Sequence, residues 1–288
     1  MRKIQYRTFQ NCLLLSNSTI EIVVSTDFGP RILAYNFIGE ANVLGIHAAA
    51  KAETALGEFK PYGGHRLWIA PENMPNSYAP DNAPVEYFFD EQANSIRLVP
   101  PPEPITKTQK EITVTLDAQG SGVKVQHKIT NLGAGEIELA AWALTIMRGE
   151  GGEVFIPNEP FAAYGAETLL PVRNLTVWSY TDLTDSRWRF DKDYIRLRVD
   201  ENQPQPQKIG VLNKQERVEY RLADAVFTKR FEHSEKSVYP DMNSNVEIYT
   251  AGDFIEIETL APLTRLSPMS ATEHTEFWHL DKVNEANA

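Results

Sequence analysis

The chain has 288 residues, of which 42% are hydrophobic and 23% are charged. This is the composition of an ordinary globular protein with enough apolar side chains for a sizeable core, which excludes disorder of the whole chain. The formal net charge is −11, and lysines and arginines form no dense block in the sequence. Nucleic-acid binding needs clustered cations that displace counterions from the phosphates, so the sequence predicts no nucleic-acid partner.

The beginning of the chain bears on the compartment. Its first apolar run, Cys12–Leu15, is much shorter than the core of a signal peptide or a membrane span. Cys12 is the single cysteine, so no internal disulfide and no cysteine-based zinc site can form. We expect Cys12 to pack in the core beside the leucines that follow it. We predict a cytoplasmic protein with no membrane partner and no metal site.

Apolar residues recur at every second position through most of the chain, a pattern typical of half-buried β-strands. Helical periodicity is weak, and its best candidate, residues 48–57, predicts one short helix or turn. An all-β fold is therefore favoured over an α/β fold. The alternating segments cover residues 19–25, 111–116, 122–129, 136–142, 194–199, 218–222, 245–250 and 254–260.

The length of the chain does not require more than one domain, because all-β sandwiches of this size are common. Two proline-rich stretches, 99–104 and 203–207, are interpreted as connections between strands rather than linkers between domains. We predict a single β-sandwich domain over residues 1–281. A polar tail over residues 282–288 follows it.

The segment from Tyr62 to Glu72 concentrates side chains suited to sugar binding. Two glycines precede an imidazole, a guanidinium, an indole and a carboxylate. Charged groups bind sugar hydroxyls, and the C–H faces of a pyranose stack on aromatic rings. In an extended strand Arg66 and Trp68 share one face, and His65 lies on the other. Pairing of Arg66 with a core carboxylate and packing of Trp68 explain the pattern equally well.

A second polar cluster lies on a predicted hairpin over residues 239–260. Asp241 and Glu247 stand on its first half, and Glu258 on its second. Glu258 runs into the apolar stretch 259–263, and a carboxylate buried there needs a partner or a function. Lys229 is a further candidate, because it could supply a cation to the same cleft.

Taken together, these segments resemble a bacterial family of the galactose mutarotase-like superfamily, over nearly the whole chain. The resemblance implies a large antiparallel two-sheet β-supersandwich whose concave sheet holds a sugar. It is carried by Gly63-Gly64-His65-Arg66-Leu67-Trp68, Ala70-Pro71-Glu72, Tyr239-Pro240-Asp241, Asn245-Val246-Glu247, Glu256-Ile257-Glu258-Thr259-Leu260 and Glu273-His274-Thr275-Glu276-Phe277-Trp278.

The resemblance also implies a chemistry. Aldose 1-epimerases open and close a sugar ring with a carboxylate base and a histidine acid, and they need no cofactor. Glu258 is similar to the epimerase base, and Arg66 to the sugar-binding arginine. The strand that carries the acid in epimerases corresponds here to residues 141–147, which contain no histidine. His65 replaces that acid only if the two preceding glycines turn its ring into the cleft.

Three functions are therefore considered. The first is a carbohydrate isomerase of the aldose 1-epimerase type, with Glu258 and His65 as catalytic residues. The second is a carbohydrate-binding or sensing protein that lacks proton-transfer chemistry. The third is a lyase or hydrolase acting on an oligosaccharide, with Glu258 paired with Glu72 or Asp241. Association with further copies of the chain, as a homo-oligomer, is also considered. The predicted sugar contacts are Arg66, Trp68, Glu72, Lys229, Asp241 and Glu247.

Overall fold

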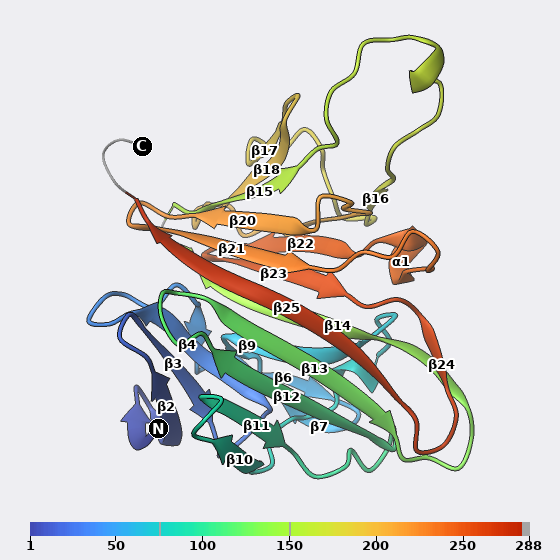
Figure 1. Ribbon diagram of the computed structural model, residues 1–288. Coiled ribbons are helices and arrows are strands. Elements are labelled where there is room, and N and C mark those ends of the chain that lie inside the picture. Colours follow the sequence, from blue (N-terminus) through green and yellow to red (C-terminus); the bar gives the residue numbers. More distant parts are fainter. Residues whose placement is uncertain (75, 150, 284–288) are drawn as a thin grey trace.

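The computed structural model describes residues 1–74, 76–149 and 151–283. Two large antiparallel sheets account for most of these residues (Figure 1). The predicted all-β, two-sheet architecture is confirmed, and each alternating segment in the sequence coincides with a strand to within one residue at its start or end. Among the described residues, none of the helices has the length and apolar character needed to cross a membrane.

The larger sheet has eleven strands, and its middle carries the residues singled out in the sequence. Along the sheet, neighbours in space are often far apart in sequence. The order is β1 (Arg2–Tyr6), β2 (Phe9–Ser16), β3 (Ile20–Ser25), β4 (Arg31–Phe37), β9 (His65–Ala70), β14 (Ile137–Arg148), β23 (Phe254–Leu260), β22 (Val246–Ala251), β19 (Gln207–Val211) and β16 (Leu175–Val177), and β24 (Thr264–Leu266) pairs with β14.

The second sheet has ten strands and packs against the first. Its longest strand, β25, runs diagonally across the molecule between β13 and β21 (Figure 1). The order is β10 (Glu86–Asp90), β11 (Ser95–Val99), β12 (Thr108–Leu116), β13 (Val123–Asn131), β25 (Ala271–Lys282), β21 (Ala225–Phe231), β20 (Arg217–Arg221), β15 (Glu153–Pro157), β18 (Tyr194–Arg198) and β17 (Trp188–Phe190).

The core lies between the two sheets and follows from the two-residue period of the strands. In β13, for example, Val123, Val125, His127 and Ile129 are buried, and the residues that alternate with them are only partly covered. The central strands of the larger sheet are covered on both faces, so β14 is buried over most of its length. Cys12 is buried in a smaller apolar cluster, as expected from its leucine neighbours.

Two local predictions differ from the structure. Residues 48–57 do not form a helix; they lead into a small hairpin of β6 (Ala52–Thr54) and β7 (Gly57–Phe59). The Thr54 hydroxyl donates to the Gly57 carbonyl at 2.8 Å, and Gly57 has a φ of +119°, so a side chain and a glycine close the turn. Lys282, predicted as the first residue of the polar tail, is instead the last residue of β25. Residues 284–288 lie outside the described part of the chain.

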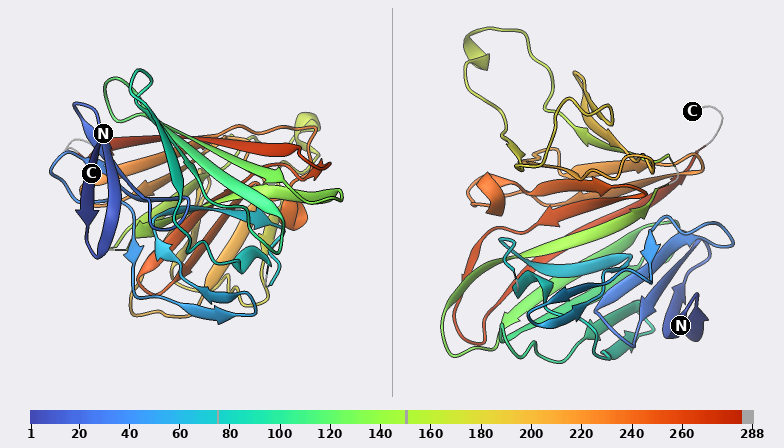
Figure 2. Two further views of the ribbon diagram at one scale, coloured as in Figure 1. Left: turned by 90° about the horizontal axis from the view of Figure 1, so that it is seen from below. Right: turned by 180° about the vertical axis from the view of Figure 1, so that it is seen from behind.

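The remaining elements are short. A second small sheet pairs β5 (Ile46–His47) with β8 (Tyr62–Gly63). The helical turns are η1 (Asn76–Tyr78), η2 (Ala166–Thr168) and α1 (Pro240–Asn243). Between β15 and β16, residues 158–174 form a long loop that projects beyond both sheets, and this segment is called the arm below (Figures 1 and 2).

Candidate functional site

A cleft of about 420 Å³ opens on the face of the eleven-stranded sheet that points away from the other sheet. Strands from the middle of the sheet form its floor, and residues after β16 and before β19 contribute to its rim. The lining residues are Phe59, Arg66, Trp68, Glu72, Tyr78, Trp142, Leu144, Trp178, Tyr180, Pro206, Lys208, Tyr249, Phe254, Glu256 and Glu258.

Strand β9 delivers Arg66 and Trp68 to the cleft. Arg66 Nη2 donates to Glu256 Oε1 at 3.0 Å, and the guanidinium carbon lies 4.6 Å from the centre of the Trp68 ring. Both interpretations of the sequence therefore apply at once, since Arg66 is paired with a carboxylate and also lines the cleft. The pair Arg66–Glu256 is largely buried, which makes its position well defined.

Lys208, which lines the cleft, is paired with two buried carboxylates. Lys208 Nζ lies 2.7 Å from Glu247 Oε2 and 3.2 Å from Glu258 Oε2. The indole nitrogen of Trp142 donates to the same Glu258 oxygen at 2.9 Å. The ammonium group also lies 4.8 Å and 4.7 Å from the ring centres of Trp142 and Trp178. Lys208 is thus held by two carboxylates and two aromatic faces.

Burial of this cluster changes its proton affinities. Burial raises the pKa of Glu258 above its usual value, although the nearby Lys208 ammonium opposes the change. Burial also raises the pKa of Glu247 well above its usual value. Burial lowers the pKa of Lys208, but Glu258 and Glu247 outweigh that effect and the net pKa is raised. Lys208 therefore stays charged, and Glu258 is a stronger base than a solvated glutamate.

Several residues of the cleft were not expected from the sequence. Trp178 and Tyr180 follow the edge strand β16, and Trp142 and Lys208 come from β14 and β19. The signal for Lys208 was present, because it begins the apolar run Lys208-Ile209-Gly210-Val211 and a lysine in such a strand needs a partner. The aromatic residues gave no comparable signal, since Trp and Tyr serve equally well in a core.

The structure brings together only part of the predicted site. Arg66, Trp68, Glu72 and Glu258 line one cleft. Glu247 is fully buried beneath it and reaches it through Lys208. Asp241 lies in the α1 turn and is outside the lining. Tyr78 donates a 2.5 Å hydrogen bond to Glu72 Oε1 at the edge of the cleft.

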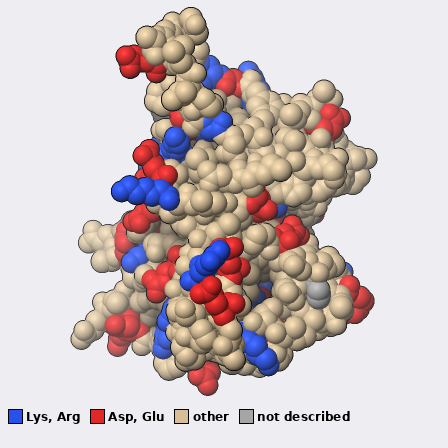
Figure 3. Space-filling model, turned by 90° about the vertical axis from the view of Figure 1, so that its right-hand side faces the viewer, with Lys and Arg blue, Asp and Glu red and all other residues tan. Residues whose placement is uncertain are grey.

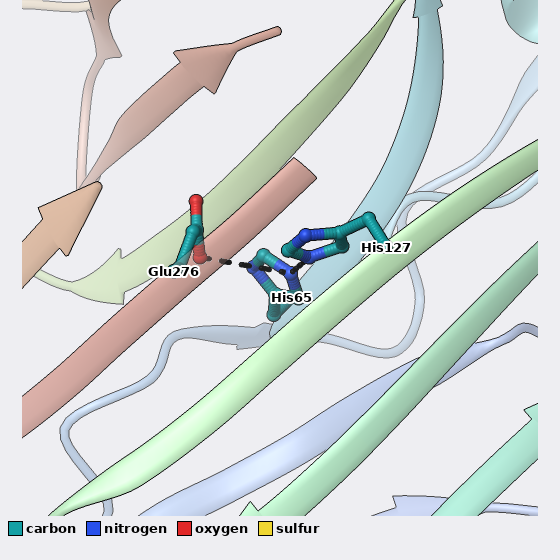
Figure 4. A group of neighbouring side chains, drawn as sticks. All are labelled: His65, His127 and Glu276. Carbon is teal, nitrogen blue, oxygen red and sulfur yellow. Dashed lines mark hydrogen bonds and ion pairs between the residues drawn. The ribbon is translucent and has the colours of Figure 1, made fainter. Parts of the chain in front are cut away.

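His65 and Lys229 lie on the opposite side of the sheet. Both side chains are completely buried between the two sheets, so neither contacts the cleft. His65 Nε2 lies 2.6 Å from His127 Nε2 of β13 and 4.0 Å from Glu276 Oε2 of β25 (Figure 4). The two glycines before His65 leave the strand alternation intact, and His65 therefore occupies the face opposite to Arg66.

The donor atoms of His65, His127 and Glu276 lie within 4.8 Å of one another, a spacing that could hold a metal ion. Hydrogen bonds already use these atoms, however. Lys229 places its ammonium group 2.8 Å from Glu276, and it also donates to Thr145 at 2.6 Å and to the Ile257 carbonyl at 3.1 Å. A cation would meet this ammonium charge, so we interpret the cluster as a structural polar network.

Neither a protein-family model nor a curated protein matches the chain by sequence. Solved structures do match its fold. A galactose mutarotase-like protein from Lactobacillus casei has a TM-score of 0.59 and 10% identity, over 94% of this chain and 100% of its own. A galactose mutarotase related enzyme from Lactobacillus acidophilus has a TM-score of 0.59 and 8% identity, over 95% of this chain and 98% of its own.

A TPR-domain containing protein from Parabacteroides distasonis reaches a TM-score of 0.62 with 11% identity, over 96% of this chain and 48% of its own. The chain thus has the galactose mutarotase-like fold that was expected from its sequence. At these identities the likeness shows the fold and leaves the activity to be argued from the site.

Proposed function

We propose that the protein binds a carbohydrate in the cleft on the eleven-stranded sheet. The observation that carries the proposal is the lining itself, which combines aromatic rings with the ion pairs Arg66–Glu256 and Lys208–Glu258. Aromatic faces stack on the C–H groups of a sugar ring, and charged groups bind its hydroxyls. A volume of about 420 Å³ lies within the usual range of small-molecule sites.

A second candidate function, isomerisation at the anomeric carbon, is favoured by Glu258. This carboxylate lines the cleft, and its raised pKa suits a general base. It would take the proton of the anomeric hydroxyl while an acid protonates the ring oxygen, so that the ring opens and closes without a cofactor. No histidine lines the described cleft. We propose Tyr180 or Tyr249, which both line the same cleft, as the acid.

The experiment that tests both functions is NMR at the anomeric centre of a panel of free hexoses, pentoses, uronic acids and hexose phosphates. We expect saturation transfer to at least one sugar, and faster anomer exchange if Glu258 is a catalytic base. Glu258→Gln should abolish the acceleration. The matched control is Glu256→Gln, the same change two residues along β23, which should weaken binding and leave the acceleration of bound sugar intact.

Each outcome has a distinct meaning. Saturation transfer without faster exchange supports the binding protein and contradicts the isomerase. Equal loss in both variants shows that Glu258 acts through binding alone. If no sugar in the panel gives saturation transfer, the monosaccharide proposal is wrong.

A further inference from the structure

The arm exposes an unusual amount of apolar surface. Five of its large apolar side chains are more than half exposed, and Tyr164 and Leu170 are 91% and 82% exposed. Exposed apolar side chains that gather in one segment in this way often mark a contact with a binding partner. The five residues are Phe161, Tyr164, Leu169, Leu170 and Val172.

Specific contacts fix the base and the tip of the arm. Arg173 Nε lies 2.6 Å from Glu159 Oε2, and Arg173 Nη2 donates to the Pro157 carbonyl at 2.7 Å. At the tip, the Gly165 amide donates to Thr168 Oγ1 at 2.8 Å. These contacts hold the arm in a defined conformation. In this conformation the sheets of the same chain do not cover its apolar side chains.

The arm leads directly into β16, which is an edge strand of its sheet. β16 is the last strand of the eleven-stranded sheet, and no other strand of the described chain pairs with its outer side. Its Leu175 and Val177 are 42% and 50% exposed. An exposed edge strand with apolar side chains is a template for pairing with another strand.

The size and charge of this surface indicate its partner. The five arm residues together with Leu175 and Val177 expose on the order of 800 Å², which is close to the roughly 800 Å² that each partner contributes to a standard interface. Between residues 160 and 172 the only charged side chain is Glu167, and Lys192 places its ammonium group 4.8 Å from the centre of the Phe161 ring. Figure 3 shows one acidic group on the projecting top of the molecule and charged groups of both signs around its base. A surface with so little charge offers no complementarity to a highly charged partner.

We propose that this surface, the arm with β16, binds a second copy of the chain and forms a two-fold symmetric dimer. A two-fold contact places the same patch on both sides, and an apolar, nearly uncharged patch next to an edge strand can meet its own copy without charge repulsion. Two β16 edges would lie antiparallel across the axis, and the arms would cover one another. The dimer does not depend on the proposed sugar binding.

The dimer contact would adjoin the cleft. Trp178 directly follows β16, and both Trp178 and Tyr180 line the cleft. Pairing of β16 with its copy would therefore hold one wall of the cleft in place in each protomer.

The first test is analytical ultracentrifugation of the full chain over a range of protein concentrations. We expect a species of twice 32.5 kDa that dissociates on dilution. The double variant Tyr164→Asp with Leu170→Asp should sediment as a monomer under conditions in which the wild type is a dimer. Its control is Ile105→Asp, which changes a 55% exposed isoleucine in the loop between β11 and β12 and should leave the dimer intact. Thermal unfolding of each variant shows that it is folded.

A second measurement locates the contact. Cys12 is buried, so Tyr164→Cys introduces one accessible thiol, and a bismaleimide should join two chains through their arms. Gln92→Cys, at the remote β10–β11 turn, should not be joined. A wild type that is monomeric at every concentration overturns the proposal. A dimer that persists in the variant with both arm substitutions also overturns it. A monomer whose arm becomes covered only when a polysaccharide or a lipid vesicle is added overturns it as well.

Discussion

At the scale of single residues, the protein has two clusters of polar side chains, one on each face of the eleven-stranded sheet. Glu258 faces the cleft, and Thr259, the next residue, faces the polar network between the sheets. In the network, the Thr259 hydroxyl donates to Glu276 and lies 2.7 Å from His274 Nε2. Each member is satisfied by a neighbour, which is the condition under which buried polar groups are compatible with a stable core.

This network predicts a specific sensitivity to acid. Burial, with a contribution from the neighbouring His127, lowers the pKa of His274 to about 3, against about 6.5 in the unfolded chain. Between these values the unfolded chain binds one more proton at this site than the folded chain does. The contribution of neutral His274 to the free energy of unfolding is therefore fully present above pH 6.5. It decreases by about 1.4 kcal/mol per pH unit as the pH falls from 6.5 towards 3.

The measurement compares urea unfolding of the wild type and His274→Gln at pH 7 and pH 5. At pH 7 we expect the variant to be less stable by about 1–2 kcal/mol, because the hydrogen bond to Thr259 is perturbed. On going to pH 5 the wild type should lose about 2 kcal/mol more than the variant. His65, His127, Lys229 and Glu276 are present in both proteins. Equal losses in the two would show that His274 does not titrate as the structure requires.

At the scale of elements, the position of β9 depends on Gly64. This residue has a φ of +70°, and a Cβ atom there would lie 2.1 Å from the Ile32 carbonyl oxygen. Its amide donates to the Gly45 carbonyl at 2.7 Å, and its carbonyl accepts from Ile146 at 2.9 Å. The glycine therefore permits close approach of three backbone segments directly before the strand that carries Arg66.

Gly64→Ala should destabilise the protein by about 3 kcal/mol or more, since the left-handed backbone and the steric clash both oppose it. Gly39→Ala is the matched control. Gly39 has a φ of +78°, but an added Cβ would meet nothing within 4 Å, so only the backbone term of about 1 kcal/mol remains. Chemical unfolding of both variants measures the difference. If the two variants unfold at the same denaturant concentration, the close approach at Gly64 does not constrain β9.

The strands show what the sequence could predict. Alternation is local, so it located segments such as 111–116 and 254–260 and correctly separated Arg66 from His65. The partners in the cleft are not local. Lys208 meets Glu258 only because β19 pairs with β22 and β22 pairs with β23. Strand pairing at such separations is set by burial of whole faces, and no short motif encodes it.

At the scale of the whole molecule, both sheets are built from strands of both halves of the chain. β14 lies between β9 and β23, and β25 lies between β13 and β21. Without the C-terminal half, β13 and β14 would each lose a neighbour and expose a long central edge. We therefore propose that residues 1–281 form one domain, in which neither half completes a core alone.

A cut in the arm tests this prediction without disturbing any strand. We expect the fragment 1–168, which ends with η2, to show no cooperative thermal unfolding by itself, because the partners of β13 and β14 are missing. Mixed or co-expressed with 169–288, it should regain a single cooperative transition and the near-ultraviolet circular dichroism of the intact chain. The exposed loop is a favourable place for the cut. A fragment 1–168 that unfolds cooperatively alone would divide the chain into two domains, and the cleft would then lie between units that fold separately.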